Sequence, residues 1–132
     1  MKQNLYNLGR CLIALYFLLP GIMKFAAWDQ HIAMMEEHGM PMASILLPLA
    51  GLIQIGAAIL IIVDRYTAIM AIVLAAMVVL INLNLHDFWN YSGIVQAHET
   101  QNFVKNLGIL AGLLILAGYR WEPLSKSKIS HA

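Results

Sequence analysis

A few ionisable side chains interrupt or border the apolar stretches of this chain, and they are the groups that could do chemistry. His86 and Asp87 are neighbours, and an imidazole with a near-neutral pKa beside a carboxylate can move protons. Lys24 and Lys105 lie at the edges of apolar stretches, where a charge is expensive unless it faces a protein interior or a wet cavity. We therefore interpret His86 and Asp87 as candidate catalytic groups on a proton route, with the two lysines nearby.

Three amides and one aromatic ring accompany these groups. Asn82 precedes His86 by one helical turn and shares its face. Gln54 has small residues on its own helix face, which indicates an interior position, and Asn106 adjoins Lys105. Trp89 could wall a planar headgroup. We expect these side chains to converge in a polar pocket. The candidate ligand-binding residues are Lys24, Gln54, Asn82, Trp89, Lys105 and Asn106.

Each of these residues also has a purely structural interpretation, which the sequence leaves open. Lysines at helix ends can snorkel to lipid headgroups. Buried amides can simply hydrogen-bond between helices. The segment that follows His86 can be an interfacial helix end. Gly108 and Gly112 share the face of Lys105, and such small residues favour the close approach of another helix.

Four long apolar segments must position these residues, at about 5–25, 43–63, 66–85 and 102–119. Hydrophobic residues make up 61% of the chain and charged residues 11%, whereas soluble domains carry about 25% charged residues. Each segment has about the 20 residues that a helix needs to cross a bilayer. The sequence predicts an all-α membrane protein, a four-helix up-down bundle that forms a single domain over residues 1–132. The first segment could instead be a signal peptide, but Lys24 and Phe25 stand where cleavage needs small residues.

The basic residues predict the orientation in the membrane. Positive charge is enriched on the cytoplasmic side. With four spans, the termini and the short turn near residue 64 share one side, and most of the basic residues belong to it. We therefore place both termini in the cytoplasm and the two longer linkers outside. The residues concerned are Lys2, Arg10, Arg65, Arg120, Lys126 and Lys128.

Composition excludes two other classes of function. The net charge is +1 and the basic residues form no stripe, so no nucleic-acid partner is expected. The single cysteine, Cys11, cannot form an internal disulfide, which argues against a self-contained thiol relay.

The first linker is rich in methionine and histidine, and two interpretations remain open for it. Thioether and imidazole groups such as Met34 and His38 suit Cu(I). Trp28, Ile32 and Met35, however, have the spacing of one apolar helix face, which would rest on the membrane. The second interpretation leaves no metal site.

The order and spacing of several short motifs resemble the DoxX family of small four-span membrane proteins. The resemblance covers nearly the whole chain. One departure is Gln54, which stands where the family often has a glutamate. The matching pieces are Arg10 with the run that ends in Gly21-Ile22-Met23-Lys24-Phe25, then Gly39-Met40-Pro41, His86-Asp87-Phe88-Trp89 and Phe103-Val104-Lys105-Asn106-Leu107.

The resemblance implies a multi-pass protein of the bacterial inner membrane. Some relatives are linked to quinone-coupled oxidation of sulfur compounds, and others to membrane complexes that respond to oxidative stress. A quinone is therefore the cofactor that the resemblance suggests, with Lys24, Lys105 or Asn106 as donors to its carbonyl oxygens and His86 with Asp87 as the proton route. Because the chain encodes no electron carrier, a membrane or peripheral redox partner protein would supply one.

Our first interpretation is thus an integral-membrane subunit of a redox-linked complex with a quinone or lipid-like ligand. Membrane lipids and further copies of the chain are its other expected partners. One alternative is a non-catalytic scaffold or assembly protein. Another is a small-solute or copper carrier, which would need an oligomer because four spans are few for alternating access.

Overall fold

The computed structural model describes residues 1–121, and this part of the chain is all-helical. Lys126 and Lys128, which entered the prediction of orientation, lie outside the described residues. Four of the helices are long and apolar enough to cross a membrane. The elements in chain order are α1 (Lys2–Ala26), α2 (Trp28–Glu37), α3 (Ala43–Ile62), α4 (Thr67–Leu85), η1 (Phe88–Asn90) and α5 (Gly93–Arg120).

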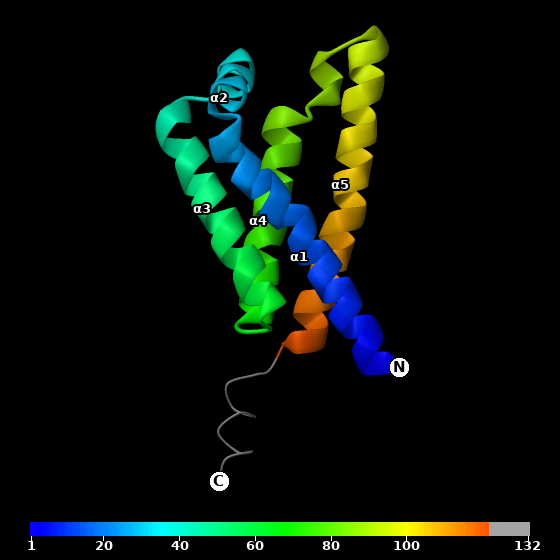
Figure 1. The fold of residues 1–132 in the computed structure, drawn as a ribbon. Helices are drawn as coiled ribbons and strands as arrows, with labels where there is room; N and C mark the ends of the chain where they lie inside the picture. The colour runs from blue at the N-terminus through cyan, green and yellow to red at the C-terminus, as the bar shows by residue number, and fades with distance from the viewer. Residues whose placement is uncertain (122–132) are drawn as a thin grey trace.

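The long helices run alternately up and down in two closely packed pairs, α1 with α3 and α4 with α5 (Figure 1). The N-terminus, the α3–α4 turn and the end of α5 lie together at one end, here called the terminal end. The short helix α2 and the α4–α5 connection lie at the other, here called the linker end. The two pairs contact each other mainly through α3 and α4, which a short turn joins. This arrangement agrees with the predicted four-helix architecture, and which end faces the cytoplasm stays a prediction.

Polar contacts hold the α3–α4 turn at the terminal end. Asp64 and Tyr66 adopt left-handed backbone conformations there, with φ of 58° and 55°. The Asp64 carboxylate accepts hydrogen bonds from Thr67 Oγ1 at 2.6 Å and from Tyr6 Oη at 3.2 Å, and it pairs with Arg120 at 3.2 Å. One carboxylate therefore ties α1, α4 and the end of α5 together.

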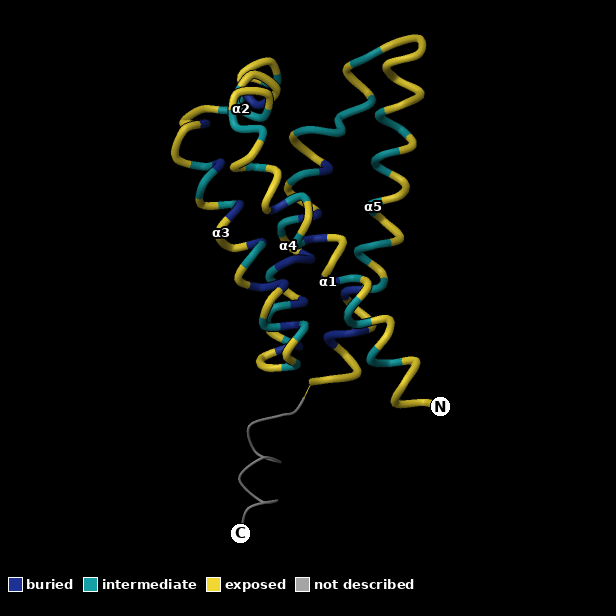
Figure 2. The backbone as a smooth tube through the Cα atoms, viewed as in Figure 1, coloured by how far each residue is buried: buried dark blue, intermediate teal, exposed yellow. Residues whose placement is uncertain are grey.

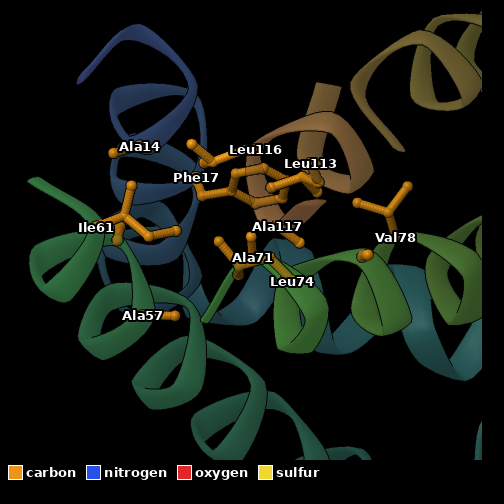
Figure 3. Close-up of a cluster of buried hydrophobic side chains, with 12 residues drawn as sticks. Ala14, Phe17, Ala57, Ile61, Ala71, Leu74, Val78, Leu113, Leu116 and Ala117 are labelled. Carbon is orange, nitrogen blue, oxygen red and sulfur yellow. The ribbon is translucent and has the colours of Figure 1, made fainter. Parts of the chain in front are cut away.

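The hydrophobic core fills the half of the bundle nearest the terminal end. All four long helices contribute side chains to it, and these point toward one another in Figure 3. The largest of them, such as Leu74 and Leu113, are fully buried. Toward the linker end the upper part of α5 carries no buried residue (Figure 2). The bundle is thus densely packed in one half and less filled in the other.

Glycines allow the close approach of α1 and α3. A Cβ atom added to Gly21 would lie 2.9 Å from Ile55 Cγ1, and one added to Gly51 would lie 2.6 Å from the Phe25 ring. Real Cβ atoms do not come so close to such neighbours, so only glycine fits at the observed separation. A smaller contact of this kind occurs at Gly112, where a Cβ would lie 3.3 Å from Ile13 Cδ1, whereas Gly108 faces open space.

The main difference from the predicted spans is at the fourth. Its helix begins at Gly93, after Ser92 in extended conformation, and not near residue 102. Its 28 residues span about 42 Å, more than the roughly 30 Å of a hydrocarbon core, so the helix is longer than a perpendicular crossing needs. Hydropathy alone missed its first turns because their residues are mostly polar.

The first linker forms the helix α2, as one of its two interpretations required. Met35 is buried and packs with Trp28 and Ile32 against the start of α3. The apolar face of α2 therefore packs against the first turns of α3, whereas the sequence predicted that this face would rest on the membrane. The described residues contain no cluster of three or more His, Cys, Asp or Glu side chains that could hold a metal.

Candidate functional site

A cavity of about 650 Å³ occupies the less filled half of the bundle, near the linker end. Side chains from α1 to α5 line it, and the lining is mostly apolar. Its volume lies within the usual range of about 300–1,000 Å³ for sites of small molecules and cofactors. Five predicted site residues from four different segments line this one space. They are Lys24, Gln54, His86, Lys105 and Asn106.

Gln54 lies deepest in the protein of these five, with only 3% of its surface exposed. Its side-chain amide donates a hydrogen bond from Nε2 to the carbonyl oxygen of Phe17 at 2.9 Å. The next turn of α1 contains Pro20, which has no N–H and so leaves the carbonyl of Tyr16 without its helical partner. Gln54 thus binds α1 where a proline disturbs the backbone hydrogen bonding. Its second polar atom, Oε1, is buried and has no partner among the described residues.

The two lysines reach the cavity from opposite helix pairs. Lys24 lies in the last turn of α1 and is partly buried, and Lys105 lies on α5 and is more exposed. Neither forms an ion pair with any residue of 1–121, where the paired carboxylates are bound to other groups. An ammonium group without a counter-ion beside an apolar cavity can donate hydrogen bonds to a ligand.

The amides predicted to bind a ligand are largely bound to each other. Asn106 Nδ2 donates to Asn82 Oδ1 at 2.9 Å, and Asn82 Nδ2 donates to the carbonyl oxygen of Phe103 at 3.2 Å. Tyr16 Oη donates to Asn106 Oδ1 at 3.3 Å. Asn82 is buried and does not line the cavity. This chain of hydrogen bonds joins α1, α4 and α5, so a role in helix packing accounts for both asparagines.

His86 pairs with a carboxylate that the sequence did not single out. Its Nδ1 lies 2.7 Å from Glu99 Oε2, whereas the adjacent Asp87 carboxylate accepts from Asn90 Nδ2 at 2.6 Å. The backbone leaves α4 at His86 with φ −118° and ψ 45°, and the two neighbouring side chains find different partners there. The sequence predicted that the His86 imidazole would act with the Asp87 carboxylate. In the structure its partner is the Glu99 carboxylate.

Asp87 and Trp89 lie outside the cavity lining. Trp89 is 51% exposed and stands edge-on to Phe88 and Phe103, with ring centroids 5.3 Å and 6.1 Å away. It thus belongs to an aromatic cluster at the linker end and forms no wall of the cavity. Asp87 takes part in a separate contact with His38, whose Nε2 lies 3.8 Å from its Oδ1.

Glu99 is the residue of the site that sequence reasoning missed, and a signal for it was present. Glu99, Asn102 and Asn106 follow an i, i+3, i+7 spacing, which places them on one face of a helix. The predicted fourth span begins only near residue 102 because residues 93–101 are mostly polar, so Glu99 falls outside the predicted helix. Asn102 also lines the cavity.

Comparison with known sequences decides the family. A sequence model of the DoxX family matches residues 5–87, which cover α1 to the end of α4. The chain belongs to the DoxX family. The matched range includes Lys24, Gln54, Asn82 and His86, and the α5 residues of the cavity lie beyond it.

The chain is also similar to the inner membrane protein YphA of Escherichia coli strain K12. It is 26% identical over 116 residues, which cover 88% of this chain and 83% of that protein. No solved structure matches the chain significantly. With four helices that are apolar and long enough to span a bilayer, this DoxX-family chain is a multi-pass protein of the inner membrane.

Proposed function

We propose that this DoxX-family protein is an integral-membrane subunit of a redox-linked complex and binds a quinone in the cavity near the linker end. One observation carries the proposal. A mostly apolar cavity of about 650 Å³ inside a membrane bundle is bordered by Lys24 and Lys105, which have no ion-pair partner among the described residues. Two fixed cations beside an apolar space suit a lipophilic ligand with a polar head.

The residues of the cavity fit the chemistry of a quinone head. Its ring and tail need apolar surroundings, which the side chains of α3 and α4 supply. Its carbonyl oxygens need donors, which Lys24 and Lys105 supply. Asn106 is a weaker candidate than its sequence position indicated, because its amide N–H already binds Asn82. A bound quinone supplies reversible two-electron redox chemistry, and a partner protein would exchange the electrons.

The pair His86 and Glu99 would hold and move protons for such a site. His86 lines the cavity, and its Nδ1 is bound to the Glu99 carboxylate. The Glu99 side chain is 21% exposed, so it also reaches water at the linker end. A histidine oriented by a carboxylate is a common arrangement for proton transfer, because the carboxylate fixes the ring and stabilises its charged form. This pair takes over the role that the sequence gave to His86 and Asp87.

A scaffold function is the second candidate, and a specific observation favours it. The hydrogen bonds from Tyr16 to Asn106 and from Asn106 to Asn82 join three helices and need no ligand. If all the polar residues act in this way, Lys105→Met and His86→Ala reduce stability or partner recovery but leave ligand binding unchanged.

Binding of quinone to lysine variants tests the proposal. The protein is purified from membranes, its bound lipids are extracted, and ubiquinone is then added to the protein in nanodiscs. We expect quinone to copurify and to raise the melting temperature, and we expect Lys24→Met with Lys105→Met to abolish that rise. Arg65→Met, at the opposite end of the bundle, is the matched control. Without copurifying quinone and without any effect of added quinone, the proposal fails.

A further inference from the structure

The unpaired oxygen of Gln54 indicates which kind of ligand head the cavity accepts. Gln54 is 3% exposed and lines the cavity, and its Oε1 is buried with no hydrogen-bond partner among the described residues. Its Nε2 faces the carbonyl oxygen of Phe17, which can only accept. A flipped amide would place Oε1 against the Phe17 carbonyl, and two acceptors cannot pair. The orientation of the amide is therefore fixed, and its unpaired atom, Oε1, is an acceptor.

Most donors around the cavity are already bound to other groups. Tyr16 Oη donates to Asn106 Oδ1. The Asn106 amide donates to Asn82 Oδ1, and the Asn82 amide donates to the Phe103 carbonyl. These donors therefore have partners of their own. A donor for Oε1 could come from Lys24, Lys105 or Asn102, from water or from the ligand itself.

Lys24 on α1 and Gln54 on α3 both lie beside the close contact between these two helices. Gln54 packs on Gly21, where a Cβ would lie 3.4 Å from the Gln54 Cβ and Cγ atoms, and Lys24 follows Gly21 by three residues on α1. Both residues line the cavity, so a ligand head that packs between them would find a donor in Lys24 and an acceptor in Gln54. A head that presents both an acceptor and a donor suits this position.

We infer that the cavity selects ligand heads that carry a hydroxyl group, and that it binds the reduced quinol in preference to the quinone. This inference rests on the proposed function. A quinol hydroxyl donates to Gln54 Oε1 while its oxygen atoms accept from Lys24. A quinone has acceptors only, so it offers nothing to Oε1 and competes with it for the Lys24 ammonium, and a buried polar group left without a partner is unfavourable.

Three ligands that differ only in the head test this inference. Decylubiquinol, decylubiquinone and the dimethyl ether of the quinol share a tail and ring, and only the first has a hydroxyl donor. Their dissociation constants are measured by calorimetry in nanodiscs without oxygen. We expect the wild-type protein to bind the quinol about tenfold more tightly than the other two.

Two variants of Gln54 test whether this residue recognises the hydroxyl group of the quinol. Gln54→Leu removes the acceptor, so we expect the three ligands to bind it about equally. Gln54→Glu keeps an acceptor oxygen, and when protonated it can still donate to Phe17, so we expect it to retain the preference. It serves as the conservative variant if Gln54→Leu does not fold.

Each other outcome has a definite meaning. Equal binding of all three ligands to the wild-type protein overturns the inference, with water as the partner of Gln54, and leaves the proposed function standing. A preference that persists in Gln54→Leu overturns the role of Gln54. Failure of all three ligands to bind overturns the proposed function together with the inference.

Discussion

Tyr91 Oη lies 3.1 Å from Nε2 of His38, although 53 positions separate the two residues. The Nδ1 atom of His38 lies 2.8 Å from the carbonyl oxygen of Met34, so that nitrogen carries the proton and Nε2 of the neutral ring accepts from Tyr91. Asp87 Oδ1 lies 3.8 Å from the same Nε2. This contact joins the end of α2 to the α4–α5 connection, and both segments adjoin residues that line the cavity.

Removal of the Tyr91 hydroxyl should loosen the linker end. Tyr91→Phe deletes the hydrogen bond between Tyr91 and His38, which contributes about 0.5–1.5 kcal/mol. We expect faster amide hydrogen exchange in α2 and a slightly lower melting temperature, with exchange at the terminal end unchanged. Tyr66→Phe is the control, because Tyr66 is exposed and forms no side-chain hydrogen bond within residues 1–121. Equal exchange in α2 of both variants would contradict the prediction.

Arg10 binds the end of a neighbouring helix. Its guanidinium donates to the carbonyl oxygens of Ile61 and Ile62 in the last turn of α3. The Ile61 carbonyl also accepts from the Asp64 N–H at 3.1 Å, whereas Arg10 is the partner of the Ile62 carbonyl within residues 1–121. Arg10→Met should lower the free energy of unfolding by about 2–3 kcal/mol, because it removes two charge-assisted hydrogen bonds and leaves the Ile62 carbonyl without its partner. Unfolding in mixed micelles measures the change. Arg65→Met, with an exposed side chain, should lie within about 0.5 kcal/mol of wild type.

The Asp64 carboxylate should make stability depend on pH in the acid range. Desolvation raises its pKa, but hydrogen bonds from Thr67 and Tyr6 and the charges of Arg120 and Arg10 outweigh it, so the pKa lies below the ordinary 3.8. A carboxyl group whose pKa is lower in the folded state than in the unfolded state stabilises the fold when the pH is above the unfolded-state pKa. This contribution is lost as the pH falls through the folded-state pKa.

Melting curves of Asp64→Asn across pH test this dependence. We expect the variant to melt below wild type at neutral pH, and the difference to shrink as the pH falls below about 4. Asp29→Asn, on the exposed face of α2, should follow wild type throughout. A difference that stays constant down to the acid limit would show that Asp64 contributes through hydrogen bonds alone.

Much of the site could be predicted because helix periodicity and topology decide it. The position of Lys24 at the end of α1 and that of Lys105 near the linker end of α5 follow from the order of the spans. What could not be predicted depends on contacts between distant segments. The partner of His86 is Glu99 on another helix, and Gln54 binds the backbone carbonyl of Phe17 on α1. Neither pairing has a signature in local sequence.

Gly21 should be intolerant of a side chain, because it brings α1 against α3 beside the cavity. An added Cβ would lie 2.9 Å from Ile55 Cγ1 and 3.4 Å from Gln54, so the Ile55 side chain or its helix would have to shift to admit it. Gly21→Ala should therefore lower the free energy of unfolding by about 1–3 kcal/mol, although alanine favours helix in isolation. Gly56→Ala is the matched control, since a Cβ there meets no atom within 4 Å, and it should be neutral or stabilising by up to about 1 kcal/mol.

Because Gln54 packs directly on Gly21, Gly21→Ala should also weaken ligand binding, whereas Gly56→Ala should not. Equal stability of the two variants would mean that α1 and α3 can separate freely, and that the position of Gln54 beside Lys24 is not fixed by this contact.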